Sequence, residues 1–132
     1  DGRQGELPAS KPRAAVPERT STFVVISDGA RLLLERRPPS GLWGGLLVPP
    51  EGEPAVVLSR LGLSLLAEQP LPAFKHTFTH FRLTLQPVLC RVAPSGGEDE
   101  PGLEWVAVER AADAGVPAPI RKLIRQVASV TG

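Results

Sequence analysis

The stretch "TFVVISDGARLLLERR", from Thr22 to Arg37, decides how the ordered part of this chain begins to fold. Two runs rich in β-branched and aliphatic residues, Thr22–Ser27 and Ala30–Arg37, flank the dipeptide Asp28-Gly29. Aspartate and glycine readily adopt the positive φ angles that the central positions of a tight hairpin turn require. The stretch therefore predicts an antiparallel β-hairpin.

The residues before this hairpin have a different composition. Residues 1–20 carry three prolines interleaved with charges and show no apolar period, which is typical of an interdomain linker or connector. Residues 21–132 are expected to form one domain, because 132 residues are enough for a single hydrophobic core. The chain has no methionine, even at its start, so we expect it to be a piece of a longer protein.

A proline- and glycine-rich segment, "RPPSGLWGGLLVPPEGEP", follows the hairpin. It predicts a loop with one short extended piece at Leu46–Val48, and Trp43 is expected to anchor the loop by packing; contact with a ligand or DNA is the alternative. Pro54 suits the first turn of a helix, and Gly62 suits its end.

The second half of the chain predicts strands and a final helix. From Phe81 onward apolar and polar residues alternate, which indicates a half-buried strand, and Pro87 should limit that strand to an edge or a bulge. "LEWVAV", residues 103–108, predicts another strand. A long helix is predicted near the end, with an apolar face at helical spacing: Ile120, Leu123, Ile124 and Val127. This order of elements predicts a mixed sheet with helices on its faces.

Composition excludes several classes of protein. The net charge of +1 points to no strongly charged partner, and no apolar run is long enough to span a bilayer. The single cysteine, Cys90, cannot form an internal disulfide, a CxxC site or an iron–sulfur cluster, which favours an intracellular protein. Cys90 lies in an apolar run and is expected to be a buried, inert thiol.

Few residues could carry enzymatic chemistry. The serines lack a GxSxG elbow, and "SGLWGG" lacks the spacing of a phosphate-binding loop. His76 and His80 are four apart, but β-favouring neighbours argue against a shared helix face. Glu98–Glu100 lacks an EF-hand pattern and is expected to be a solvated loop. We therefore expect no catalytic residue and no metal ligand in this chain.

The stretch "FKHTFTHF", residues 74–81, holds both histidines and three of the four phenylalanines. If the alternation that begins at Phe81 is carried backward, then Phe78, His80 and Arg82 fall on the exposed side. An exposed aromatic ring, imidazole and guanidinium could stack on a base and contact phosphate. The alternative is a strand end whose Phe78 turns into the core beside a hydrogen-bonded His80.

Three pieces in this order, "RPPSGLWGGL", "HTFTHF" and "GVPAPIRKLI", resemble the C-terminal domain of the MutY family of adenine DNA glycosylases, over about Glu18 to Val127. The resemblance implies an α+β fold, a Nudix-like α/β/α sandwich with a mixed β-sheet. It also implies a parent enzyme that removes adenine mispaired with 8-oxoguanine in base excision repair. Its glycosylase chemistry and iron–sulfur cluster belong to an N-terminal region that this chain lacks. The implied location is cytoplasmic, at the bacterial nucleoid.

The resemblance also assigns a lesion-binding site. The family's Phe-Ser-His motif lies in a β-hairpin-like loop that contacts 8-oxoguanine, and it corresponds here to Phe78, Thr79 and His80. Thr79 departs from the serine but keeps the hydroxyl. 8-Oxoguanine presents an N7–H donor and an O8 acceptor, and a hydroxyl can both donate and accept. Phe78 would wedge or stack beside the base, and His80 would meet a phosphate or test the base.

Basic residues near this site are candidates for contact with the DNA backbone. Arg36, Arg37 and Arg82 are the candidates, whereas the bases of the last helix, Arg121, Lys122 and Arg125, are interpreted as its solvated face. The expected partners are double-stranded DNA with 8-oxoguanine opposite adenine, the N-terminal catalytic domain of the same chain, and repair or replication proteins.

Two other functions remain as alternatives. One is a protein-docking module of a repair enzyme, which would use the linker and the acidic loop. The other is a Nudix pyrophosphohydrolase, whose family places several glutamates on one helix to hold Mg²⁺. Here Glu51 and Glu53 precede the predicted helix, and the helix itself has Ser59 and Arg60 but no carboxylate. The sequence therefore favours a non-catalytic domain.

Overall fold

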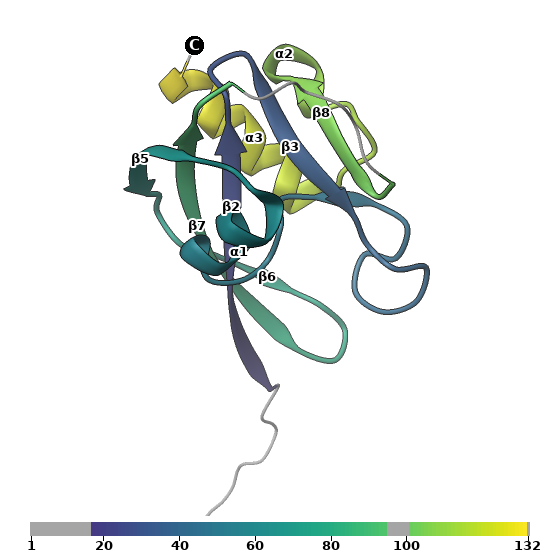
Figure 1. The fold of residues 1–132 in the computed structure, drawn as a ribbon. Helices are drawn as coiled ribbons and strands as arrows, with labels where there is room; N and C mark the ends of the chain where they lie inside the picture. Colours follow the sequence, from purple (N-terminus) through teal and green to yellow (C-terminus); the bar gives the residue numbers. More distant parts are fainter. Residues whose placement is uncertain (1–16, 95–100, 132) are drawn as a thin grey trace, which may run out of the picture.

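The computed structural model describes residues 17–94 and 101–131 (Figure 1). In this part of the chain seven strands form one mixed sheet, in the order β4-β3-β2-β7-β5, with β6 paired to β7 and β8 paired to β3. The elements are β2 (Glu18–Ser27), β3 (Arg31–Arg36), β4 (Leu47–Val48), α1 (Pro54–Leu61), β5 (Leu65–Pro70), β6 (Phe74–Thr77), β7 (Arg82–Val92), β8 (Leu103–Ala107), α2 (Val108–Ala111) and α3 (Ala118–Thr131). Among the described helices, none combines the length and the apolar character needed to cross a membrane.

The first hairpin is confirmed, with its turn one residue later than expected. β2 and β3 pair antiparallel, and the Asp28 N–H donates to the Arg31 carbonyl at 3.2 Å, so Gly29 and Ala30 lie between them. The Asp28 carboxylate accepts the backbone N–H groups of Ala30 and Arg31. Burial alone would raise the pKa of Asp28, but these hydrogen bonds and the Arg31 guanidinium hold it below its usual value.

The centre of the sheet is a parallel pair. β2 and β7 pair in register from Glu18↔Arg82 to Ser27↔Arg91, along the whole of β2. β2 therefore begins inside the expected linker of residues 1–20, because Glu18–Thr20 find hydrogen-bond partners on β7. Residues 1–16 of that linker, and the acidic loop at Glu98–Glu100, lie outside the described residues.

β7 is an interior strand, so the expectation of an edge at Pro87 was wrong. On the side away from β2 its partner changes from β6 to β5, and the register skips between Phe74↔Leu85 and Pro70↔Val88. The Pro87 carbonyl accepts the Leu71 N–H at 3.0 Å in this break. A proline is tolerated here because the ladder is already interrupted where its missing N–H would have donated.

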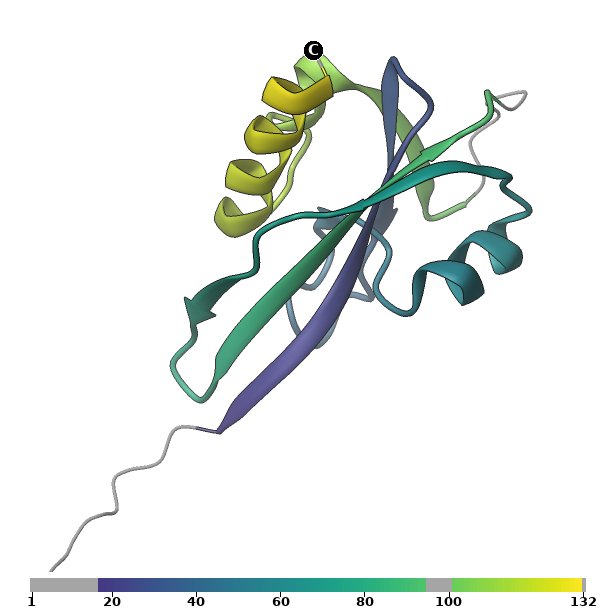
Figure 2. The same cartoon turned by 90° about the vertical axis from the view of Figure 1, so that its left-hand side faces the viewer.

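Two helices cover the two faces of the sheet (Figure 2). α3 covers one face, and its four predicted core residues are at most 1% exposed. α1 covers the other face with Val57 and Leu58, and Gly62 ends it in the left-handed conformation, as predicted. Neighbouring residues on β2 alternate between the two cores, with Phe23 and Val25 facing α3, and Val24 and Ile26 facing α1. The expected α+β architecture, a mixed sheet between helices, is thus confirmed.

We expect the packing of α3 to dominate stability. Leu123→Ala removes a fully buried side chain and should lower the free energy of unfolding by about 2–5 kcal/mol. The matched control is Leu66→Ala at a 62% exposed position, with an effect within about 0.5 kcal/mol. Urea denaturation of both variants measures the difference, and equal losses would contradict the placement of α3 on the sheet.

Candidate nucleic-acid interface

The two histidines and the phenylalanines of "FKHTFTHF" lie on a hairpin rather than on one continuous strand. β6 and β7 pair antiparallel up to Thr77↔Arg82, and the Phe78 N–H donates to the Phe81 carbonyl at 2.7 Å. We call residues 78–81 the tip turn. Thr79 and His80 are its two central residues and both are exposed. The geometry therefore presents one hydroxyl and one imidazole to solvent from the end of a two-stranded ribbon.

The flanks of the tip turn pack into an aromatic cluster, which consists of Phe23, Trp43, His76, Phe78 and Phe81. Phe78 stacks on Phe81 with ring centroids 4.6 Å apart, and the His76 ring meets Phe78 edge-on at 4.7 Å. Trp43 contacts Phe78 at 5.7 Å and Phe23 at 6.2 Å. The cluster thus connects the tip turn to the hydrophobic core.

Phe78 is half-buried and packs against the core, so placing it on an exposed strand face was wrong. The alternation from Phe81 onward does not extend backward because the chain reverses direction at residues 78–81. The alternative, in which Phe78 turns inward, describes its position. Of the three motif residues, Thr79 and His80 are the ones free to approach a ligand.

Trp43 holds an unusual backbone conformation. Its φ is +55°, a left-handed value that costs a bulky residue about 1–3 kcal/mol unless its surroundings impose it. The next residue has no room for a side chain, since a Cβ on Gly44 would lie 2.3 Å from the Pro39 carbonyl oxygen. The expectation that Trp43 anchors its loop by packing is confirmed by its contacts with Phe23 and Phe78.

Two of the arginines expected to contact phosphate brace this loop. Arg36 Nη1 donates to the Gly45 carbonyl at 2.7 Å, and Arg36 Nη2 lies 3.0 Å from Glu104 Oε2. Arg37 Nε donates to the Leu42 carbonyl at 3.3 Å, and its Nη1 pairs with Glu51 at 3.0 Å. A phosphate would have to compete with these partners, so their role in DNA binding stays a prediction.

Arg82, the third candidate, belongs to a looser group beside the tip turn. Its Nη1 lies 3.5 Å from a Glu18 carboxylate oxygen, and Lys75 Nζ lies 4.0 Å from the other oxygen. All three side chains are at least 40% exposed, so these pairs are weak and screened by salt. Arg82 and Lys75 can therefore turn to a phosphate at low energetic cost.

Sequence reasoning missed Arg19. Its guanidinium lies 4.5 Å from the centre of the Phe81 ring, on the strand that begins inside the expected linker. A guanidinium over an aromatic face is attracted by the ring quadrupole. The β-branched residues of "RTSTFVVI" were the available signal that the strand starts before Thr22.

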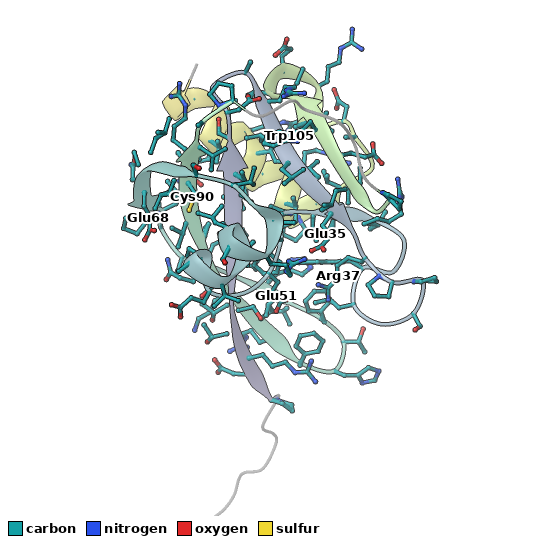
Figure 3. The ribbon with its side chains drawn as sticks, viewed as in Figure 1. Glu35, Arg37, Glu51, Glu68, Cys90 and Trp105 are labelled. Carbon is teal, nitrogen blue, oxygen red and sulfur yellow. The ribbon has the colours of Figure 1, made fainter. Side chains whose placement is uncertain are left out.

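The carboxylates near α1 do not form a Mg²⁺ site. Glu51 pairs with Arg37 and accepts the Ser21 hydroxyl at 2.6 Å, and Figure 3 shows Arg37 and Glu51 lying together. Glu35 lies 3.7 Å from Arg60, which is the charge that α1 itself contributes. No group of three or more potential metal ligands occurs within the described ranges. Mg²⁺ prefers carboxylate oxygens, so a helix that offers a guanidinium does not fit it.

Cys90 lies on β7 and is fully buried in the core that α1 covers, as expected. Burial, and to a lesser extent the nearby Glu68 carboxylate, raises the pKa of the Cys90 thiol to about 11. Because the reactive species is the thiolate, Cys90 is unreactive near neutral pH.

The described fold and sequence match one domain family. Residues 21–126 match the Nudix domain family, which is most of the chain. The chain belongs to the Nudix family. Solved structures share the fold: the C-terminal domain of mouse MUTYH, in a complex with human PCNA, is 26% identical, covers 83% of this chain and 87% of that chain, and has a TM-score of 0.63.

More distant relatives show the fold alone. A MutT Nudix hydrolase from Burkholderia pseudomallei is 19% identical, with coverage of 83% of this chain and 98% of that chain and a TM-score of 0.58. The Nudix domain of Shewanella oneidensis NrtR, complexed with ADP ribose, is 14% identical, with coverage of 93% and 94% and a TM-score of 0.60.

We expect Phe78 to be an anchor of the tip turn. Phe78→Ala should lower the free energy of unfolding by about 2–3 kcal/mol, less than the loss at a fully buried phenylalanine. His80→Ala, two residues away and exposed, should change it by less than about 0.5 kcal/mol. Thermal and urea unfolding compare the two, and a neutral Phe78→Ala would place this ring outside the packed cluster.

Proposed function

We propose that this chain is the lesion-recognition domain of an adenine DNA glycosylase of the MutY type. In this proposal it contacts 8-oxoguanine opposite adenine, and an N-terminal region outside this chain carries the iron–sulfur cluster and hydrolyses the adenine N-glycosidic bond. The observation that carries the proposal is the tip turn, where Thr79 and His80 are exposed on a ribbon fixed by an aromatic cluster. The resemblance of "HTFTHF" to the family's lesion-binding motif supports the same residues.

The chemistry depends on holding a hydroxyl in one place. The Thr79 hydroxyl can accept the N7–H of 8-oxoguanine or donate to its O8, whereas in guanine N7 is itself an acceptor. A freely rotating hydroxyl could serve either base, so discrimination requires a fixed backbone. Phe78 supplies that constraint beside Thr79, because it is stacked on Phe81 and held by Trp43. The stiff χ1 of a β-branched threonine restricts the hydroxyl further.

The DNA backbone would lie around the tip turn. His80 is exposed at the apex of the turn. Arg82 and Lys75 lie on the two strands beside it, and both pair only weakly with the Glu18 carboxylate. Arg36 and Arg37 are proposed to contribute only where a phosphate displaces Glu104 or Glu51. A chain of net charge +1 should bind DNA weakly.

The similarity to mouse MUTYH supports this proposal over a nucleotide hydrolase. The likeness to its C-terminal domain covers most of both chains. Hydrolysis of a nucleoside triphosphate by a Nudix helix requires clustered carboxylates, and α1 carries Ser59 and Arg60 at its polar positions instead. The shared fold does not by itself imply the shared reaction.

A second candidate function is docking to a replication protein. The C-terminal domain of mouse MUTYH was crystallised in a complex with human PCNA, which supports docking to a protein as a second candidate function. This chain exposes Val56 on α1 and Leu65 and Leu66 on the edge strand β5, where an apolar partner could bind. Titration with the sliding clamp of the source organism tests this: Leu66→Glu should abolish docking and Thr79→Val should preserve it, whereas no binding to the unmodified chain contradicts it.

For lesion reading, Thr79→Val removes the hydroxyl at nearly constant volume. We expect the ratio of affinities for 8-oxoguanine and guanine duplexes to fall roughly tenfold, as one or two hydrogen bonds are lost. Thr79→Ser, which keeps the hydroxyl, should retain the preference. Fluorescence anisotropy at low salt, with duplexes that differ only in this base, measures the ratio in the chain and in the full glycosylase. An unchanged ratio in Thr79→Val would reject the proposed contact.

A further inference from the structure

Trp43 is the residue through which the hydrophobic core meets the tip turn. Phe23 is fully buried, Trp43 contacts it at 6.2 Å, and the same indole contacts Phe78 at 5.7 Å. Trp43 comes from the loop between β3 and β4, far from residues 78–81 in the sequence. A second segment of the chain therefore sets the position of the residue that precedes Thr79.

We propose that Trp43 is a positioning residue for lesion reading: its indole holds Phe78 and thereby fixes Thr79 and His80 at the tip turn. This inference rests on the proposed function for its biological meaning. Its structural content is independent of DNA, because the contacts that hold Phe78 are present in the free chain.

The loop that carries Trp43 is built to keep the indole in place. Arg37 Nε donates to the carbonyl of Leu42 and Arg36 Nη1 to the carbonyl of Gly45, so the residues on both sides of Trp43 and Gly44 are tied to β3 and its end. Gly44 cannot carry a Cβ, and the Leu46 N–H closes back on the Trp43 carbonyl at 3.0 Å. Arg36 and Arg37 thus support the tip turn through the loop, whether or not they meet a phosphate.

The backbone conformation of Trp43 separates positioning from simple packing. A left-handed φ of +55° suits glycine or asparagine, and a bulky aromatic residue adopts it only where its surroundings require it. A loop that needed only to turn here would be more stable with a small residue. The presence of an indole at this φ implies that packing of the ring compensates for the strain, and the rings that it contacts are those of Phe23 and Phe78.

The other side of the stack is closed by a different element. Arg19 lies over Phe81, Phe81 stacks on Phe78, and Phe78 contacts Trp43. These four side chains therefore form a continuous row where the tip turn joins the strands. Phe78 cannot leave this arrangement without breaking ring contacts on both sides. Thr79 and His80 consequently follow a residue, Phe78, that is packed between Phe81 and Trp43.

The test is Trp43→Asn, which removes the ring while asparagine tolerates the left-handed conformation. The control is Trp105→Phe, at the other tryptophan, which packs against the opposite core. Amide NMR of the free chain should show broadened or shifted signals for Thr79 and His80 in Trp43→Asn and unchanged signals in Trp105→Phe. Trp43→Phe should restore them in part, and it serves as the test variant if Trp43→Asn does not fold.

Duplex binding gives the second readout. Trp43→Asn should lower the affinity ratio for 8-oxoguanine over guanine about twofold to tenfold, the value of one aromatic contact, while Trp105→Phe leaves it unchanged. If Trp43→Asn preserves both the amide signals and the ratio, the positioning role is overturned and lesion reading stands. If the full glycosylase without any substitution binds 8-oxoguanine and guanine duplexes equally well, the proposed lesion reading fails. The amide signals of the free chain then decide alone whether Trp43 positions the tip turn.

Discussion

The parallel ladder between β2 and β7 is the constraint on which the remaining structure depends. It joins the segment that enters the domain to a strand that comes some sixty residues later, through ten residue pairs. Parallel strands need a long crossover, and here the crossover contains β3, β4, α1, β5 and β6. Along the ladder, successive side chains point to opposite faces of the sheet, and α1 and α3 cover them on the two sides. It also brings Arg19 beside the β6–β7 hairpin, which no local interaction would do.

The elements that sequence analysis predicted well are those with a strong local signal. The Asp28-Gly29 hairpin, the Pro54-to-Gly62 helix and the four-residue apolar stripe of α3 each depend on short-range chemistry. β5 escaped prediction because all six of its residues are exposed, so burial left no alternation to detect. The tip turn was implied only by the family resemblance, because it contains no glycine or proline and the residues around it favour strand.

The candidate site shows the same division. The sequence singled out Thr79 and His80 only through a resemblance, and it could not decide whether Phe78 faces outward or inward, since that depends on Trp43 and Phe81. The partners of Arg36 and Arg37 are equally non-local, because Glu104 and Glu51 come from other strands and loops. Around α1 the same holds for the carboxylates, because Glu51 is paired with Arg37 and Glu35 with Arg60.

The long β2–β7 ladder has a mechanical consequence. Among the described residues the chain enters the domain at Pro17, directly before β2. A pull applied at Pro17 along β2 would load the β2–β7 hydrogen bonds in shear, all at once, rather than peel them apart one by one. Shear is the geometry in which a sheet resists extension most strongly. The same strand begins beside the tip turn, with the Arg82 N–H donating to the Pro17 carbonyl at 2.9 Å. Such a pull would thus displace Thr79 and His80 together with the sheet, without unravelling β2.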